Sequence, residues 1–207
     1  MLSPAECQLL AEYAHFKMSV SPHANSVKKG VLDNVHREYG DFMMEMLLAK
    51  FTPLVEKATG LSLWPTLSFY YTYRTGNELK KHHDRSSCEI VAGLCIGADA
   101  QFKAAKGTWP LILNLEGQPE AFALDFGDLL IFRGSDIEHW REVFTGEWFV
   151  SAIFGYVDQQ GSYAFQKFDQ RKSLGKAHIG MIAWLWGCAK NTLKQWVSRL
   201  RATLSRH

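Results

Sequence analysis

Residues 73–84 have the sequence YRTGNELKKHHD, which ends in a His-x-Asp pair formed by His82 and Asp84. Residues 67–73 are rich in aromatic side chains and predict a β-strand, and residues 88–96 predict a second strand. The pair therefore lies between two predicted strands. Side chains at positions i and i+2 of an extended segment point to the same face. An imidazole and a carboxylate on one face can supply two ligands of a site built from two histidines and one carboxylate.

A second histidine, His139, stands in a comparable setting later in the chain. Residues 127–132 predict a turn followed by an apolar strand, and residues 133–138 form a polar loop. Residues 148–157 predict another strand after a short turn. His139 is therefore expected at the start of one strand of a hairpin. Together with the His-x-Asp pair it completes the ligand set of a metal centre.

These motifs resemble those of the iron(II)/2-oxoglutarate-dependent dioxygenases, on the prolyl 4-hydroxylase side of that superfamily. The resemblance covers residues 64–156 and rests on a small set of positions, namely Tyr73, Gly76, Leu79, His82, Asp84, Gly127, Asp128, His139 and Gly146. It implies that iron(II) binds to His82, Asp84 and His139, and that Tyr73 donates a hydrogen bond to 2-oxoglutarate. It also implies a double-stranded β-helix, which is a jelly-roll or cupin-like barrel.

The chain departs from the family at one position. Relatives carry an Arg or Lys two residues after the glycine that corresponds to Gly146, where it pairs with the distal carboxylate of 2-oxoglutarate; this chain has Trp148 there. A buried carboxylate still needs a cation, because an unpaired buried charge is costly. Arg141 is the best substitute, because it shares the inward face with His139 if the segment is extended, and its fork can bind a carboxylate through two bonds. Less favoured candidates are Arg85 and Arg133.

The resemblance implies an enzyme that uses Fe(II), 2-oxoglutarate and O2 to hydroxylate, or otherwise oxidise, an unactivated C–H bond. The substrate would be a small molecule or a peptidyl residue, and succinate and CO2 would be released. Two other functions remain open. Because Trp148 stands at the position of the usual cation, an iron-dependent barrel oxygenase that does not use 2-oxoglutarate remains an alternative. A non-catalytic barrel that binds a ligand or partner is the third function, and the intact ligand set argues against it. Trp140 and Trp148 could line the site or lie in the core.

Composition places the chain among globular proteins of one domain. It has 207 residues, of which 47% are hydrophobic and 21% charged. The net charge of +2 gives no reason to expect a nucleic-acid partner. The four cysteines show no metal-type clustering, so we expect reduced thiols in a cytoplasmic protein. The sequence has no signal-peptide pattern and no apolar run long enough to span a bilayer, so we expect neither a signal peptide nor a membrane span.

The order of predicted elements gives a mainly β fold with flanking helices. Residues 1–60 form an N-terminal helical part, with helices expected from Pro4 to about Lys17 and over residues 41–59. Residues 61–160 form the barrel core, in which residues 97–108 are expected to be a loop. Residues 161–207 form a basic C-terminal extension, and the 207 residues together make a single dioxygenase domain.

The C-terminal extension predicts a basic amphipathic helix over about residues 179–205. No acidic residue follows Asp169. Apolar residues recur at helical spacing, at Ile182, Leu185, Ala189, Leu193, Trp196 and Leu200. We expect the apolar face to pack on the barrel or on a second subunit of a homo-oligomer. Contact with an anionic membrane surface or a partner is the alternative.

Overall fold

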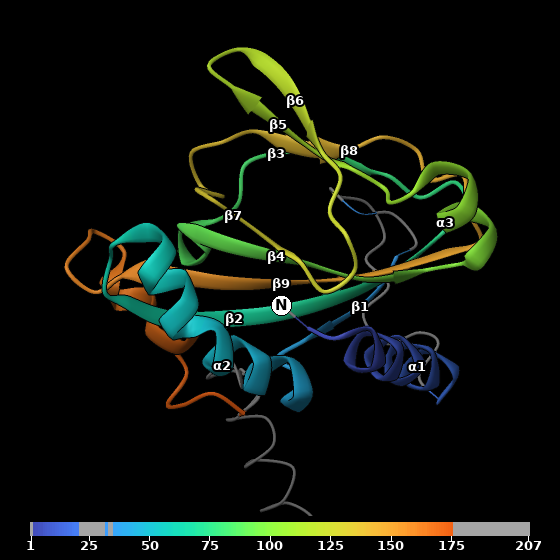
Figure 1. Cartoon of the computed structure of the whole chain (residues 1–207). Coiled ribbons are helices and arrows are strands. Elements are labelled where there is room, and N and C mark those ends of the chain that lie inside the picture. The colour runs from blue at the N-terminus through green and yellow to red at the C-terminus, as the bar shows by residue number, and fades with distance from the viewer. Residues whose placement is uncertain (1, 21–31, 33–34, 176–207) are drawn as a thin grey trace, which may run out of the picture. The chain divides into compact units, whose positions relative to one another are not determined.

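Two antiparallel β-sheets form the centre of the fold (Figure 1). The structure is a computed structural model that describes residues 2–20, 32 and 35–175. The larger sheet has the strand order β1-β2-β9-β4-β7, and the smaller sheet has the order β3-β8-β5-β6. The strands are β1 His36–Tyr39, β2 Leu63–Arg74, β3 Leu79–His82, β4 Ile90–Ala98, β5 Leu111–Leu115, β6 Gln118–Phe122, β7 Leu129–Phe132, β8 His139–Arg141 and β9 Trp148–Asp158.

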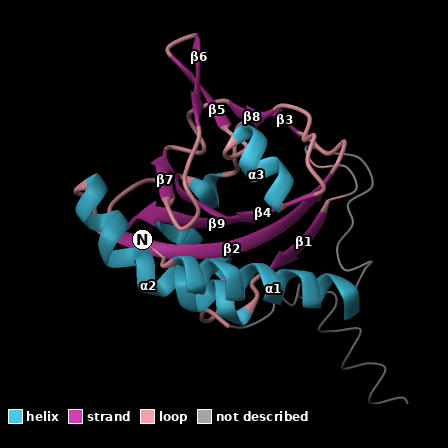
Figure 2. Ribbon diagram, turned by 45° about the vertical axis from the view of Figure 1, so that its right-hand side comes forward, coloured by secondary structure: helices cyan, strands magenta, loops and turns pink. Residues whose placement is uncertain are grey.

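Helices α1 and α2 cover the outer face of the larger sheet, and the smaller sheet lies on its other side (Figure 2). The α-helices are α1 Pro4–Val20, α2 Phe42–Thr59 and α3 Ala100–Lys106, and the 3-10 segments are Ser86–Cys88 and Ala164–Gln170. Ser3 and Glu6 form a capping box at the start of α1, since each accepts a hydrogen bond from the backbone N–H of the other. The Asp41 carboxylate caps α2, and Gly60 ends α2 at a φ of 72°.

The long strands are apolar on both faces because both faces of the larger sheet are covered. Along β9, Val150, Ala152 and Phe154 lie in the cluster shared with the helices, whereas Phe149 and Ile153 pack in the clusters between the two sheets. This alternation follows from the two-residue period of an extended strand. The inward face of β9 therefore helps to wall the space between the sheets.

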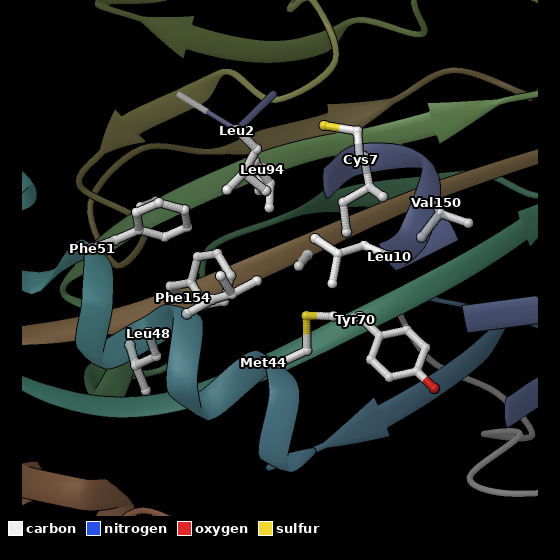
Figure 3. Packing of buried hydrophobic residues seen from close by; sticks show 14 of the residues in the cluster. Leu2, Cys7, Leu10, Met44, Leu48, Phe51, Tyr70, Leu94, Val150 and Phe154 are labelled. Atoms are coloured by element: carbon white, nitrogen blue, oxygen red, sulfur yellow. The ribbon is translucent and has the colours of Figure 1, made fainter. Parts of the chain in front are cut away.

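Packing of α2 on the larger sheet forms the main core (Figure 3). Met44 and Leu48 are fully buried, and the ring of Phe51 lies 5.5 Å from that of Phe154. The Tyr156 hydroxyl donates a hydrogen bond of 3.0 Å to the Leu48 carbonyl, so its polar atom is satisfied inside the core. Full burial of each such large apolar side chain stabilises the fold by about 1.5–3 kcal/mol.

The predicted mainly β jelly roll with N-terminal helices is confirmed. Residues 97–108 differ from the prediction, because they contain α3 rather than a loop alone. The physical cause is Asp99, whose carboxylate accepts hydrogen bonds from the backbone N–H of Phe102 and also from that of Glu147. The Phe102 side chain is buried, which anchors this short helix by packing.

The described residues all lie within one compact unit, Met1–Lys176. The predicted basic helix over residues 179–205 lies outside the described residues. No helix among residues 2–20, 32 and 35–175 has the length and apolar character to cross a membrane. Cys7, Cys88 and Cys95 are buried free thiols.

Candidate metal centre and active-site cavity

Pairing between β3 and β8 brings the two predicted histidine ligands together. His82 and His139 are directly opposite in the register of the two strands, and their ring centroids are 4.2 Å apart. Asp84 follows β3 and points its carboxylate at both rings. The distance from His82 Nε2 to Asp84 Oδ1 is 3.6 Å, and that from His139 Nε2 to Asp84 Oδ2 is also 3.6 Å. The three ligand atoms all lie within 4.8 Å of one another.

Backbone carbonyls fix the tautomers of the two histidines. His82 Nδ1 lies 2.8 Å from the Lys80 carbonyl, and His139 Nδ1 lies 2.9 Å from the Ile137 carbonyl. A carbonyl oxygen only accepts, so each Nδ1 carries the proton and donates it. In the neutral rings both Nε2 atoms then present lone pairs to the Asp84 carboxylate. Lone pairs and a negative charge that converge in this way are the donor set of a metal ion, with the outer hydrogen bonds that orient metal-binding histidines.

The environment of the two rings differs. Burial alone would lower the pKa of His82, but the Asp84 carboxylate and the Lys80 carbonyl outweigh it and raise that pKa. Burial lowers the pKa of His139, although Asp84 acts in the opposite direction. His139 is only 4% exposed, so it forms the inner wall of the site. A neutral His139 is the form that binds a metal ion.

Gly134 gives the Asp84 carboxylate its space. A Cβ atom at position 134 would lie 2.5 Å from Asp84 Oδ2 and 2.8 Å from the Cys88 carbonyl oxygen. The Gly134 carbonyl also accepts a hydrogen bond of 2.8 Å from the Asp84 backbone N–H. The loop that leads from β7 to His139 therefore holds Asp84 in place. Sequence reasoning missed this role, because a glycine in a polar loop gives no sign of what it packs against.

Arg141 is a buried cation in the same region. Its guanidinium lies 5.0 Å from the Trp109 ring centroid and 5.1 Å from that of Phe149, and it donates a hydrogen bond to the Trp109 carbonyl. Burial lowers the pKa of Arg141, yet a guanidinium stays charged in proteins. No carboxylate among the described residues forms an ion pair with it. A buried guanidinium without a described acidic partner can bind an anion.

Tyr73 lies beside Arg141 on the inward face of β2. Burial raises the pKa of Tyr73 to about 12, although Arg141 and the Ser151 hydroxyl lower it. The phenol therefore stays protonated at neutral pH and can donate a hydrogen bond. Ser151, on β9, is a further polar group at this place that sequence reasoning did not single out. Its position on the inward face follows only from the strand register.

The other candidate cations already have acidic partners. Arg85 is paired with Asp169 at 2.7 Å. Arg133 is half-exposed and lies 3.6 Å from Glu89 and 3.4 Å from Asp136. Of the three arginines named from the sequence, Arg141 is the one whose charge is buried without a described acidic partner.

The two tryptophans that could line the site lie elsewhere. The Trp148 side chain is on the helix side of the larger sheet, where its ring meets that of His15 edge-on at 4.6 Å. Trp140 points its ring nitrogen to Glu142 and stacks under the Lys81 ammonium. Neither lines the cavity. Trp148 faces outward because it is one residue from Phe149, and neighbouring residues of a strand point to opposite faces.

A cavity of about 350 Å³ between the two sheets joins these groups. Its wall contains the three predicted metal ligands together with Tyr73 and Arg141. Most of the remaining wall is apolar, as is typical of small-molecule sites. The described residues thus bring all five predicted site residues to one cavity.

Comparison with solved structures finds the same fold in several oxygenases. A Pseudomonas putida prolyl-4-hydroxylase aligns with a TM-score of 0.61 over 77% of this chain and 89% of its own, at 16% identity. A Trichoplax adhaerens prolyl hydroxylase, solved with a hypoxia inducible factor oxygen degradation domain peptide fragment, aligns at 0.57 over 75% and 80%, at 13% identity. SnoN, a non-heme alpha ketoglutarate dependent epimerase from nogalamycin biosynthesis, aligns at 0.57 over 86% of each chain, at 13% identity.

Comparisons at the level of sequence found no match, either among models of protein families or among curated proteins. At identities of 13–16%, the structural likeness establishes the fold that this chain shares with these proteins. The residues of the site, and not the fold, determine its chemistry.

Proposed function

We propose that this protein is a non-haem Fe(II)- and 2-oxoglutarate-dependent dioxygenase that hydroxylates, or otherwise oxidises, an unactivated C–H bond. The observation that supports it is the meeting of two kinds of group in one cavity. His82, Asp84 and His139 offer a ligand set of two histidines and one carboxylate. Arg141 offers a buried cation without a described acidic partner. A dicarboxylate that chelates a metal ion would bind at the ligand set through one end and at the Arg141 guanidinium through the other.

Each residue has one task in this proposal. His82, Asp84 and His139 hold the metal on one side and leave the cavity side open. Arg141 binds the distal carboxylate of 2-oxoglutarate, and Tyr73 donates a hydrogen bond to it. The apolar wall excludes water from the reacting groups. When bound, iron(II) and 2-oxoglutarate would activate O2 for this oxidation, with succinate and CO2 as by-products.

The primary substrate is a small molecule or a peptidyl residue. A cavity of about 350 Å³ is near the lower end of the range for ligand sites, which favours a small group. The buried free thiols Cys7, Cys88 and Cys95 suit a reducing compartment, so we place the protein in the cytoplasm.

Anaerobic titration tests the co-substrate. Calorimetry should show that 2-oxoglutarate binds to the Fe(II)-loaded protein and binds much more weakly without metal. Succinate release in air, scored across a panel of small molecules and peptides, then identifies oxidised substrates. Iron binding without any 2-oxoglutarate binding would instead support an oxygenase that does not use this co-substrate.

Arg141 is the first residue to vary. We expect Arg141→Ala to weaken 2-oxoglutarate binding roughly 10- to 150-fold, because loss of a charge-assisted hydrogen bond costs about 1.5–3 kcal/mol. Arg141→Lys should recover part of this loss, since a point charge does not reproduce the planar fork. Fe(II) affinity should change little in both variants.

Arg85→Ala and Arg133→Ala are the matched controls, because their charges are already paired with carboxylates. Both should keep the wild-type affinity for 2-oxoglutarate. Unchanged affinity in Arg141→Ala, with a large loss in either control, would assign the carboxylate to that other arginine.

A further inference from the structure

Arg37 on β1 lines the same cavity as Arg85 and Arg141, and it has no task in the proposed reaction. In the register of β1 and β2 it lies opposite Tyr71, which also lines the cavity. Residues directly opposite each other in an antiparallel pair point to the same face. The guanidinium lies 5.7 Å from the ring centroid of Phe69, which is the next inward-facing residue of β2. The position of Arg37 is therefore set by the sheet rather than by a loop.

The charge of Arg37 is not matched by an acid among the residues that the structure describes. No described carboxylate lies within ion-pair distance of it. Its Nε is buried and has no hydrogen-bond partner there. An unsatisfied buried donor on a cation is costly, and an anionic ligand in the cavity would satisfy it.

Arg85, the other arginine at this end of the cavity, is different. The Asp169 carboxylate binds it at 2.7 Å and also accepts a hydrogen bond of 2.6 Å from the Tyr39 hydroxyl. Its charge is therefore compensated within the protein. Of the three arginines that line the cavity, Arg37 and Arg141 are left without an acidic partner in the described part of the chain.

The two unmatched arginines lie at different places along β2. Arg141 is beside Tyr73, since its guanidinium stacks on Trp109 and Phe149, which both pack on Tyr73. Arg37 is over Phe69. Phe69 and Tyr73 are four residues apart, which corresponds to roughly 13 Å along an extended strand. The two guanidinium groups thus contact well-separated parts of the sheet, so we assign a separate anionic group to each.

Tyr71 connects Arg37 to the metal centre. Burial raises the pKa of Tyr71 well above its ordinary value; Asp84 raises it further and Arg37 lowers it. Arg37 lies opposite Tyr71 in the strand register, and Tyr71, Arg37 and Asp84 all line the same cavity. A molecule held by Arg37 would therefore share this cavity with the Asp84 carboxylate.

We propose that Arg37 binds an anionic group of the primary substrate, so that this enzyme oxidises a small acid at a carbon away from its carboxylate or phosphate group. This inference rests on the proposed function. With bound metal, Asp84, 2-oxoglutarate and Arg141 on its distal carboxylate, the described residues that line the cavity leave one positive charge, that of Arg37. A substrate with one negative charge neutralises it. The apolar wall near Arg37, which includes Leu32 and Phe69, suits the rest of such a molecule.

Binding of acids and their neutral amides tests the proposal. The probes are 3-phenylpropionate, hexanoate and N-acetyl-L-leucine, each compared with its carboxamide, which has nearly the same shape without the charge. Ligand-observed NMR would be recorded anaerobically with the full-length Fe(II)-loaded protein in saturating 2-oxoglutarate, which occupies Arg141. We expect the wild type to prefer at least one acid over its amide by roughly 10- to 100-fold.

Arg37→Gln should abolish this preference, and Arg37→Lys should keep part of it. Arg74→Gln, at the exposed end of β2, is the control and should behave as the wild type. Equal binding of acid and amide in the wild type across the panel would overturn the proposal. So would an unchanged preference in Arg37→Gln.

The 2-oxoglutarate affinity of Arg37→Gln separates this inference from the proposed function. We expect it to equal that of the wild type. A loss as large as that in Arg141→Ala would make Arg37 a co-substrate residue and would overturn the inference. If the wild type does not bind 2-oxoglutarate at all, the proposed function fails. The acid preference is then measured without 2-oxoglutarate in Arg37→Gln and Arg141→Gln, and it supports the inference only if Arg37→Gln alone loses it.

Discussion

Gly134 shows how the absence of one side chain determines the geometry of the metal centre. Asp84 occupies the volume that any larger residue at position 134 would fill. The same glycine accepts a backbone hydrogen bond from Asp84 through its carbonyl. The carboxylate is therefore held against both imidazole rings before a metal ion binds. Such preorganisation lowers the conformational cost of metal binding.

Gly134→Ala should displace Asp84, because its Cβ would lie 2.5 Å from Asp84 Oδ2 and 2.6 Å from Val91 Cγ2. We expect metal affinity to fall roughly 10- to 100-fold, as when a group that orients a ligand is lost. Gly93→Ala is the matched control, since its Cβ would make an ordinary contact of 3.9 Å with the Leu130 carbonyl. Calorimetric titration with Fe(II) under anaerobic conditions measures both. Equal affinity in the two variants would show that Asp84 does not need this space.

At the scale of elements, Asp99 joins the start of α3 to the start of β9. Its carboxylate accepts hydrogen bonds from the backbone N–H of Phe102 at 2.8 Å, Glu147 at 2.7 Å and Trp148 at 3.3 Å. These bonds hold its pKa below the ordinary value, although burial opposes them. Asp99 thus sets where β9 begins, and with it the place of Phe149 against Arg141.

Asp99→Ala should reduce the free energy of unfolding by about 1–3 kcal/mol, because it removes a helix cap and leaves N–H groups of β9 unpaired. Asp99→Asn should lose less, since an amide oxygen still accepts hydrogen bonds. Urea denaturation at pH 7 measures the change. Asp125→Ala, at an exposed position, serves as the control and should stay near the wild type. A stable Asp99→Ala variant would mean that packing of Phe102 and Trp148 alone fixes where α3 and β9 begin.

At the scale of the whole molecule, Asp169 links segments that are far apart in sequence. It accepts a hydrogen bond of 2.6 Å from the Tyr39 hydroxyl on β1 and pairs with Arg85 after β3 at 2.7 Å. The chain after β9 is thereby fastened to the first strand and to the segment that carries Asp84. Burial opposes ionisation of Asp169, but the bonds from Tyr39 and Arg85 outweigh it and hold its pKa below the ordinary value.

This lowered pKa predicts how stability depends on pH. The unfolded Asp169 takes up a proton near pH 3.9, about the usual value, while the folded group does so only at lower pH. Between these two values the unfolded state binds more protons, so acid favours unfolding. The contribution of Asp169 is fully present above about pH 4 and is lost as pH falls through the folded pKa.

Asp169→Asn should therefore be less stable than the wild type at pH 7, by about 1–3 kcal/mol, and the difference should shrink as the pH approaches 3. Urea unfolding curves at intervals between pH 7 and pH 3 measure it. Asp136→Asn, half-exposed in the loop before β8, is the control. A difference that stays constant over this range would show that the charge of Asp169 plays no part.

Removal of residues 177–207 tests the organisation of the chain. The described residues all lie within one compact unit, Met1–Lys176, so we expect the shortened protein to fold and to bind Fe(II) with unchanged affinity. If the predicted basic helix packs on the barrel, the shortened protein will have a lower Tm and more exposed apolar surface. If it serves a membrane or partner, the Tm will stay the same and co-sedimentation with anionic liposomes will be lost. Failure of the shortened chain to fold would contradict the assignment of an independent unit.

Short-range patterns in the sequence predicted the main elements and the candidate metal ligands. Aromatic and apolar runs between turn signals predicted the strands, because a strand covered on both faces buries most of its residues. Ser3 and Gly60 marked helix ends through hydrogen bonds and backbone angles that depend on nearby residues only. His82, Asp84 and His139 were recognisable because metal chemistry needs those side chains, whatever surrounds them.

Groups that act across long separations were decided by the tertiary structure alone. Asp99 caps α3 through the nearby Phe102, but its bonds to residues 48 and 49 positions away, which join that helix to β9, follow only from the tertiary structure. Trp148 does not line the cavity, because the register of β9 turns its side chain toward α1. Arg141 remained without a described acidic partner, while Asp169 neutralised Arg85 from 84 positions away. A sequence records which charges exist, but only the packing of distant segments determines which of them are matched and which are left to bind a ligand.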